Sequence, residues 1–180
     1  GQDQYLIAAT AKRPGGGWRK VKDLTITNLE LCSPPDHRIT GAVFIRDGAN
    51  IQLTHLNVHD FRWNGLRVTF CKQQVEIAHC TLTDASTEGL PHREGGLIRT
   101  RWLGDARIHH NRIIARNTGG FGYKGGGHIK VRFDHNYVDT RYFAFESPFE
   151  NEFEVELDHN YLTACISIPK FIQTDPKTKG

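Results

Sequence analysis

Methionine is absent from this chain, cysteine occurs only four times, and apolar residues never gather into a long run. A membrane-spanning helix needs about 18 or more consecutive apolar residues, so no membrane partner is expected. The cysteines have no C-x-x-C spacing, which argues against zinc, and we expect mainly buried free thiols. The formal net charge is only +3 and the basic residues are scattered, so no nucleic-acid partner is expected either.

No signal peptide is visible in this sequence, which opens on Gly1. The repeat described next runs to Leu162 without the capping segment that solenoids need. We therefore expect a fragment of a longer protein. Its expected location is extracellular or periplasmic, and the absence of a visible signal peptide does not bear on this. Residues 1–180 are expected to form a single domain, with an entry segment at 1–20, coils at 21–170 and a tail at 171–180.

An eight-residue pattern recurs along the chain every 24 to 31 residues. It reads apolar, any, apolar, any, His or Asn, then Asn, Cys or Leu, any, apolar. Repeats of this length indicate stacked units. The six copies are Leu24–Leu31, Ile51–Val58, Val75–Leu82, Ala106–Ile113, Val131–Val138 and Val155–Leu162.

The apolar positions of each copy alternate with a period of two, which indicates a strand, and the alternation breaks once at the His-Asn pair. The extra residue forces a bend, and asparagine tolerates the left-handed backbone that a bend needs. Three strands of about five to six residues with three bends account for the repeat. The leucine-rich signature is absent. The sequence predicts an all-β, right-handed parallel β-helix of six to seven coils.

Stacking of the coils places equivalent residues about 4.8 Å apart. One column should contain Asn28 and the histidines of the other five copies. The asparagines of the last three copies continue a second column begun by Leu29, Leu56 and Cys80. We interpret the histidine column as a ladder that bonds itself and the turn backbone, and expect no metal, because metal ligands must converge. The histidines are His55, His79, His110, His135 and His159, and the asparagines are Asn111, Asn136 and Asn160.

A second strand precedes each copy, and alternation assigns its faces. In Leu66–Phe70 we expect Leu66, Val68 and Phe70 inward, with Arg67 and Thr69 outward. In the next strand Ile98, Thr100 and Trp102 are expected inward, because the other phase would bury two arginines. The outer face is then predicted to carry Arg67, Arg99, Arg101, Lys124 and Glu146, walled by the long connections 59–65 and 83–96.

This outer face is the candidate functional site. Cleavage of a uronate by elimination needs a cation to neutralise the carboxylate and a base to take the neighbouring proton. Lys124, Glu146 and Arg101 are predicted to be catalytic. The residues predicted to bind substrate are Arg67, Arg99, His92, Arg93, Trp63 and His128.

The coil pattern, together with F-D-H-N-Y-V and L-D-H-N-Y-L, resembles the pectate-lyase-like right-handed parallel β-helix superfamily over about residues 21–170. The resemblance implies an extended polysaccharide in an outer groove. Basic residues outnumber acids on the face, so we expect an anionic glycan and β-elimination. The alternatives are a glycoside hydrolase using Glu146 with a second carboxylate, for which Glu150, Glu152, Glu94 and Asp105 are candidates, or a non-catalytic glycan-binding or structural segment. Calcium would fit some members, but no clear acidic cluster is present, so no cofactor is expected.

Overall fold

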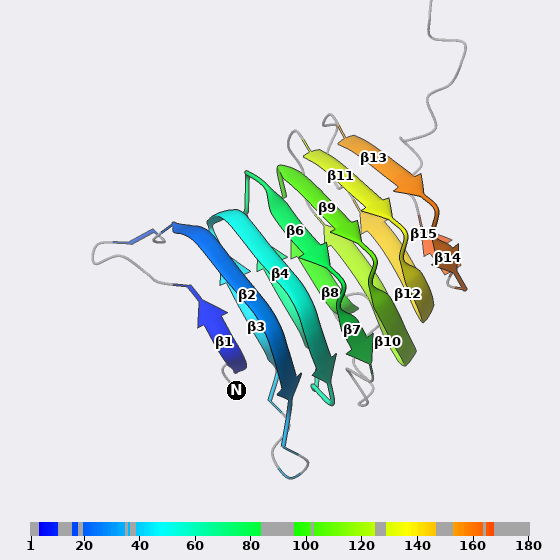
Figure 1. The fold of residues 1–180 in the computed structure, drawn as a ribbon, viewed down its shortest axis with the longest axis horizontal. Coiled ribbons are helices and arrows are strands. Elements are labelled where there is room, and N and C mark those ends of the chain that lie inside the picture. The colour runs from blue at the N-terminus through cyan, green and yellow to red at the C-terminus, as the bar shows by residue number, and fades with distance from the viewer. Residues whose placement is uncertain are drawn as a thin grey trace, which may run out of the picture.

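The chain forms a parallel β-solenoid in the computed structural model (Figure 1). The structure describes residues 4–10, 16–17, 20–34, 36, 39–83, 96–101, 103–124, 129–146, 153–163 and 165–167. For 116–121, 123–124, 129, 141–146, 153 and 165–167 the backbone alone is described. No helix occurs among these residues, and so none that could cross a membrane. The all-β prediction is confirmed.

Fifteen strands make up the described part of the solenoid. In chain order they are β1 Tyr5–Ala9, β2 Val21–Cys32, β3 Gly41–Arg46, β4 Gly48–His59, β5 Asn64–Thr69, β6 Val75–Ala78, β7 Thr81–Thr83, β8 Gly96–Arg101, β9 Asp105–His109, β10 Arg112–Lys124, β11 Ile129–Asp134, β12 Tyr137–Glu146, β13 Phe153–Asp158, β14 Tyr161–Leu162 and β15 Cys165–Ser167.

Three rows of parallel strands run along the solenoid. The first halves of the repeated pattern pair in the order β2, β4, β6, β9, β11 and β13, which Figure 1 shows side by side. Behind them, β1, β3, β5, β8, β10, β12 and β15 form a second row. The parts of the pattern after the bend form the third row. About 4 turns have all three strands described with their side chains, compared with the six to seven coils predicted.

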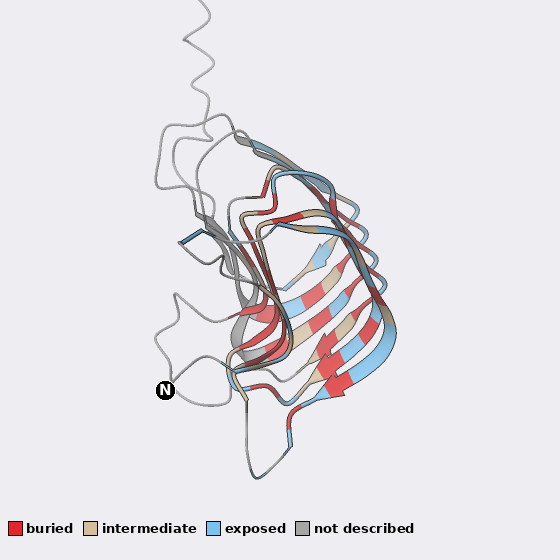
Figure 2. Cartoon of the chain, turned by 90° about the vertical axis from the view of Figure 1, so that its left-hand side faces the viewer, coloured by how far each residue is buried: buried red, intermediate tan, exposed pale blue. Residues whose placement is uncertain are grey.

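The core is a column of aliphatic side chains inside the coils. Alternate residues are buried along much of β4 and β9, and Figure 2 shows buried red bands that repeat from coil to coil. Ile51, Leu53, Val75, Ile77 and Ile108 all have exposed fractions of 2% or less. Because their register partners are also apolar, each strand buries one face against the next coil's equivalent residue, as period-two alternation requires.

The bend inside the repeated pattern lies at the histidine column. Backbone φ is +54° at His55, His110 and His135 and +55° at His79. The sequence analysis assigned this bend to asparagine tolerance, and that assignment is wrong for the later coils. The left-handed residue turns its imidazole outward, and the next residue then turns inward.

The asparagine ladder is confirmed, and it lies inside the coils. Asn136 Oδ1 accepts hydrogen bonds from the backbone N–H and the side-chain amide of Asn111, both at 3.0 Å. The Asn136 amide donates to the carbonyls of Ile108 and Asp134 at 2.9 and 3.0 Å. Asn160 repeats the arrangement one coil later. Each amide therefore satisfies backbone groups that a bend would otherwise leave unpaired.

The predicted faces of β5 and β8 are mostly confirmed. Leu66, Val68, Ile98 and Thr100 are buried, whereas Arg67 and Arg99 are half-buried and Arg101 is exposed. The end of β5 differs from the prediction. Thr69 is buried and bonds a backbone carbonyl, while Phe70 is half-buried outside with the Arg46 guanidinium 4.7 Å from its ring centroid. A left-handed backbone at Phe70, with φ of +59°, breaks the alternation there.

The cysteine prediction is confirmed for two of the three thiols that are described. Cys71 and Cys80 are free and buried, whereas Cys32 is free and exposed at the end of β2. The side chain of Cys165 lies outside the described residues. Burial raises the pKa of both the Cys71 and the Cys80 thiol to about 11.

Candidate functional site

The predicted catalytic residues lie at matching register positions on neighbouring strands of the second strand row. Lys124 on β10 is the register partner of Arg101 on β8 and of Glu146 on β12. Parallel stacking puts such partners about 4.8 Å apart along the solenoid. Arg67, Arg99 and Gly122 form a second row two residues earlier. The register that the prediction needs is therefore present, although the side chains of Lys124 and Glu146 lie outside the described part.

Two arginines of this face are held by their surroundings. Arg67 Nη1 donates to the Tyr5 hydroxyl at 3.2 Å, and its guanidinium carbon lies 4.8 Å from the ring centroid of Phe44. A Cβ at Gly122 would meet Arg99 Cδ and Nη1 at 3.7 Å, so the Arg99 side chain leans over the glycine. A side chain at this position would therefore lie in ordinary van der Waals contact with Arg99.

The remaining predicted binding residues fall into two groups. Trp63 is half-buried directly before β5. His92, Arg93 and His128 lie outside the described residues. For the hydrolase alternative, Glu94, Glu150 and Glu152 also lie outside them, and Asp105 begins β9 as the register partner of Lys130 in a different strand row. Asp105 is therefore no neighbour of Glu146.

A polar pocket lies on the first strand row, where the sequence analysis proposed no site. Its volume is about 500 Å³. Thr25, Gln52, Glu76 and Arg107 are register partners on β2, β4, β6 and β9, and they form one row of the lining. The lining residues are Asp23, Thr25, Asn50, Ile51, Gln52, Gln74, Val75, Glu76, Asp105 and Arg107. Amides, carboxylates and a guanidinium in a concave surface are suited to hydroxyl-rich ligands.

The buried carboxylate of Asp134 holds Arg107, the cationic residue that lines this pocket. Arg107 Nε and Nη2 donate to Asp134 Oδ1 and Oδ2 at 3.0 and 2.9 Å, a two-point pair. Arg132 Nε lies 3.2 Å from Asp134 Oδ1, and His135 Nδ1 lies 3.1 Å from Oδ2. The hydrogen bonds from Arg107 hold the pKa of Asp134 well below its usual range, although burial acts in the opposite direction. Asp134 is therefore ionised at neutral pH and orients Arg107.

The histidine column is confirmed as a stack, but it is exposed. Ring centroids are 5.0 Å apart for the pairs His55–His79 and His79–His110. They are 4.9 Å apart for the pairs His110–His135 and His135–His159. All five imidazoles lie on the outside. The sequence analysis expected these imidazoles to bond one another and the turn backbone. Instead they stack on the outside, and the asparagines take the inward position and bond the backbone. Desolvation and the nearby histidines lower the pKa of His110.

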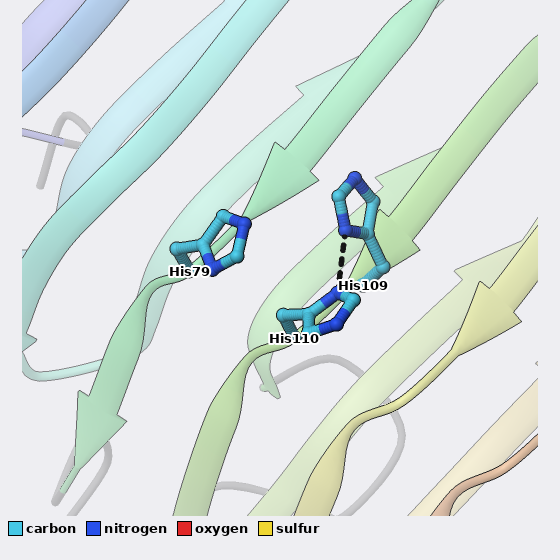
Figure 3. A group of neighbouring side chains, drawn as sticks. All are labelled: His79, His109 and His110. Carbon is cyan, nitrogen blue, oxygen red and sulfur yellow. Dashed lines mark hydrogen bonds between the residues drawn. The ribbon is translucent and has the colours of Figure 1, made fainter.

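One further histidine joins this column from the neighbouring row. His109, the last residue of β9, is buried, and its Nδ1 lies 2.9 Å from His110 Nδ1 (Figure 3). Its Nε2 lies 3.0 Å from Glu76 Oε1. The His79, His109 and His110 rings each bring one nitrogen to within 4.8 Å of the others. The sequence analysis missed this group, although H-H-N stands where two later copies read D-H-N.

Comparison with known proteins finds no family, no curated protein and no solved structure that matches this chain. The fold and the side-chain geometry therefore carry the functional argument.

Proposed function

We propose that this chain binds an extended anionic polysaccharide along the solenoid and cleaves it by β-elimination on the β5–β8–β10–β12 face. The observation that carries the proposal is the Arg101, Lys124 and Glu146 row, in which two cations and a carboxylate sit on adjacent strands. A parallel solenoid repeats this spacing along its length, and a polymer that lies along it meets the same strand face at each coil.

The proposed chemistry assigns each residue one step. Arg101 neutralises the uronate carboxylate, which makes the adjacent C–H more acidic. Lys124, as the neutral amine, takes that proton and becomes an ammonium ion, and the bond from C4 to the glycosidic oxygen breaks as the new double bond forms. Glu146, if protonated, returns a proton to the leaving oxygen. Arg67 and Arg99 extend the positive surface toward the preceding coils.

Membership of the pectate-lyase-like superfamily is part of the same proposal. The asparagine ladder and the three parallel strand rows are compatible with it. The basic excess on the proposed face favours elimination over hydrolysis, because a glycosidase needs two carboxyls within about 10 Å of each other. Asp105 does not supply the second one, since it belongs to another row.

A non-catalytic glycan-binding function is the second candidate, and the pocket on β2, β4, β6 and β9 favours it. Its side chains offer both donors and acceptors in a volume of about 500 Å³. Gln52 hydrogen-bonds Thr25 at 3.2 Å, and Asn50 bonds Asp23 at 2.8 Å, so the polar lining is partly preorganised. Preorganised polar groups lower the ordering cost of binding.

The test is turnover over a panel of anionic and neutral glycans, followed by the ultraviolet absorbance of the unsaturated product and by new reducing ends. Lys124→Ala and Glu146→Gln should each lower elimination by about 10²-fold or more. Lys130→Ala is the matched control, because Lys130 is an exposed lysine of β11 paired with Glu154. New reducing ends without ultraviolet absorbance would indicate hydrolysis in place of elimination. Full turnover in both variants would refute the assignment of the row.

Binding without turnover would favour the second candidate. Affinity electrophoresis in gels that contain the bound glycan then locates the surface. Gln52→Ala should weaken retention if the pocket binds the sugar, whereas Lys124→Ala should leave it unchanged. The opposite pattern would place the binding surface on the β8–β10–β12 face, and unchanged retention in both variants would exclude both surfaces.

A further inference from the structure

The three histidines in Figure 3 differ from the rest of the column in that their nitrogens converge. His79 and His110 stack with a 24° angle between their planes and ring centroids 5.0 Å apart. His109 stands edge-on to both, at 82° and 85°. The sequence analysis rejected a metal because a straight column cannot converge, and His109 removes that objection by entering from the side.

The local backbone explains why His109 and His110 meet. In a regular strand, successive side chains point to opposite faces. The left-handed conformation of His110, with φ of +54°, interrupts this alternation at the end of β9. The imidazoles of two consecutive residues therefore lie together, with their Nδ1 atoms 2.9 Å apart.

The carboxylate of Glu76 orients the buried member of the group. An ionised carboxylate only accepts hydrogen bonds, so the His109 nitrogen at 3.0 Å, Nε2, carries the proton. In neutral His109, Nδ1 then presents its lone pair toward His110. A carboxylate that holds the distal N–H of a histidine is the usual support of a metal-ligating imidazole, because it fixes the ring and makes it more basic.

The later coils lack this arrangement, although they have the same column. There an aspartate precedes the histidine and engages its Nδ1, as Asp134 does for His135 and Asp158 does for His159. Those carboxylates also pair with Arg132. The step from D-H-N to H-H-N therefore replaces an ion-paired carboxylate by a third imidazole.

We propose that His79, His109 and His110 form a three-histidine site for a divalent transition-metal ion of the zinc class. Nitrogens bound tetrahedrally at about 2.0–2.1 Å lie about 3.3 Å from one another. The nitrogens here lie within 4.8 Å, so binding requires a closure of about 1.5 Å at most. His79 and His110 are exposed and can rotate to supply it. Three imidazoles leave one coordination position open to water or a ligand.

Donor chemistry decides which ions fit. Imidazole suits Zn²⁺, Cu²⁺ and Ni²⁺, whereas Ca²⁺ and Mg²⁺ prefer oxygen ligands. The site is independent of the glycan proposal, because no residue of the Lys124 row takes part. Glu76 does connect it to the pocket, since that residue both lines the pocket and holds His109.

The experiment is isothermal titration of the tag-free, chelator-treated protein with ZnCl₂, with CaCl₂ as the control ion. We expect one zinc per chain with a Kd of about 1 μM or tighter, and no heat with calcium. Glu76→Gln alters only the support of His109 and should weaken zinc binding by about 10–100-fold. His79→Asn and His110→Asn each remove a ligand and should weaken it more. Asn28 occupies the equivalent left-handed position in β2, so asparagine is compatible with the backbone there.

Two variants make the test specific. His109→Asp restores the D-H-N pattern of the later coils and should abolish tight zinc binding while leaving the far-ultraviolet circular dichroism unchanged. His135→Asn removes a column histidine outside the group and should change the Kd less than about 3-fold. Absence of zinc binding in the unmodified chain would overturn the proposal. So would equal losses in His135→Asn and His79→Asn, which would indicate diffuse binding along the column.

Discussion

The asparagine ladder makes the sharpest stability prediction, and Asn136→Ala is the perturbation. The side chain accepts two hydrogen bonds from Asn111 and donates to the carbonyl of Ile108, to that of Asp134 and to Asn160 Oδ1. Alanine leaves the buried N–H of Asn111 and the carbonyl of Ile108 without these partners. Each unpaired buried group costs about 1–3 kcal/mol, so we expect a loss of about 3–5 kcal/mol in the free energy of unfolding.

Urea denaturation followed by far-ultraviolet circular dichroism measures this loss. The matched control is Asn57→Ala, because Asn57 is an exposed asparagine of β4 and its replacement should change stability by less than about 0.5 kcal/mol. The slope of the transition should stay the same in both variants if the solenoid unfolds as one unit. A loss below about 1 kcal/mol for Asn136→Ala, or one equal to the control, would refute the ladder as a main source of stability.

Three further predictions concern Asp134, the cysteines and Gly104. Asp134→Asn should lower the free energy of unfolding by about 1–3 kcal/mol at pH 7, because charge-assisted hydrogen bonds are lost. The depressed pKa of Asp134 means that this stabilisation exists above about pH 3.9 and disappears as the pH falls through the folded-state pKa. In urea titrations at acid pH, the unfolding free energies of the two proteins should therefore become equal. Thiol labelling read peptide by peptide should modify Cys32 quickly, and Cys71 and Cys80 only after unfolding, because both are buried with a pKa of about 11. Gly104→Ala should lower the melting temperature through a loss of about 1–3 kcal/mol, because its Cβ would lie 2.0 Å from a backbone carbonyl oxygen.

The rows of this solenoid were predictable because parallel stacking repeats one register at every coil. Once the repeated patterns are aligned, Arg107 must neighbour Glu76 and Arg132, and the strand pairing confirms it. The same logic placed Lys124 beside Arg101 and Glu146. In such a fold, residues that align between successive repeats are also neighbours in space.

The conformation at each bend was not predictable in the same way. Alternation shows that one extra residue exists at the His-Asn pair, but not which of the two takes the left-handed backbone. The structure gives it to His135 and turns Asn136 inward, where one amide can serve several backbone groups at once. Phe70 is the parallel case at the end of β5: a bulky residue rarely adopts positive φ, so sequence reasoning kept it inside. The His109 group was missed for this reason, because its convergence depends on the bend.

The two proposed sites also make one joint prediction, which follows from their positions on the coil. Arg101 ends β8, and His109 ends β9, so the five residues of β9 separate the cleavage row from the histidine group. At about 3.3 Å per residue this is about 16 Å of strand, too far for a metal on the histidines to touch the atoms at Lys124. Elimination should therefore proceed at the same rate in His79→Asn as in the unmodified chain, with or without zinc. If turnover instead requires zinc and fails in His79→Asn, the scissile bond lies on the pocket side, near Glu76, and Lys124 is not the base.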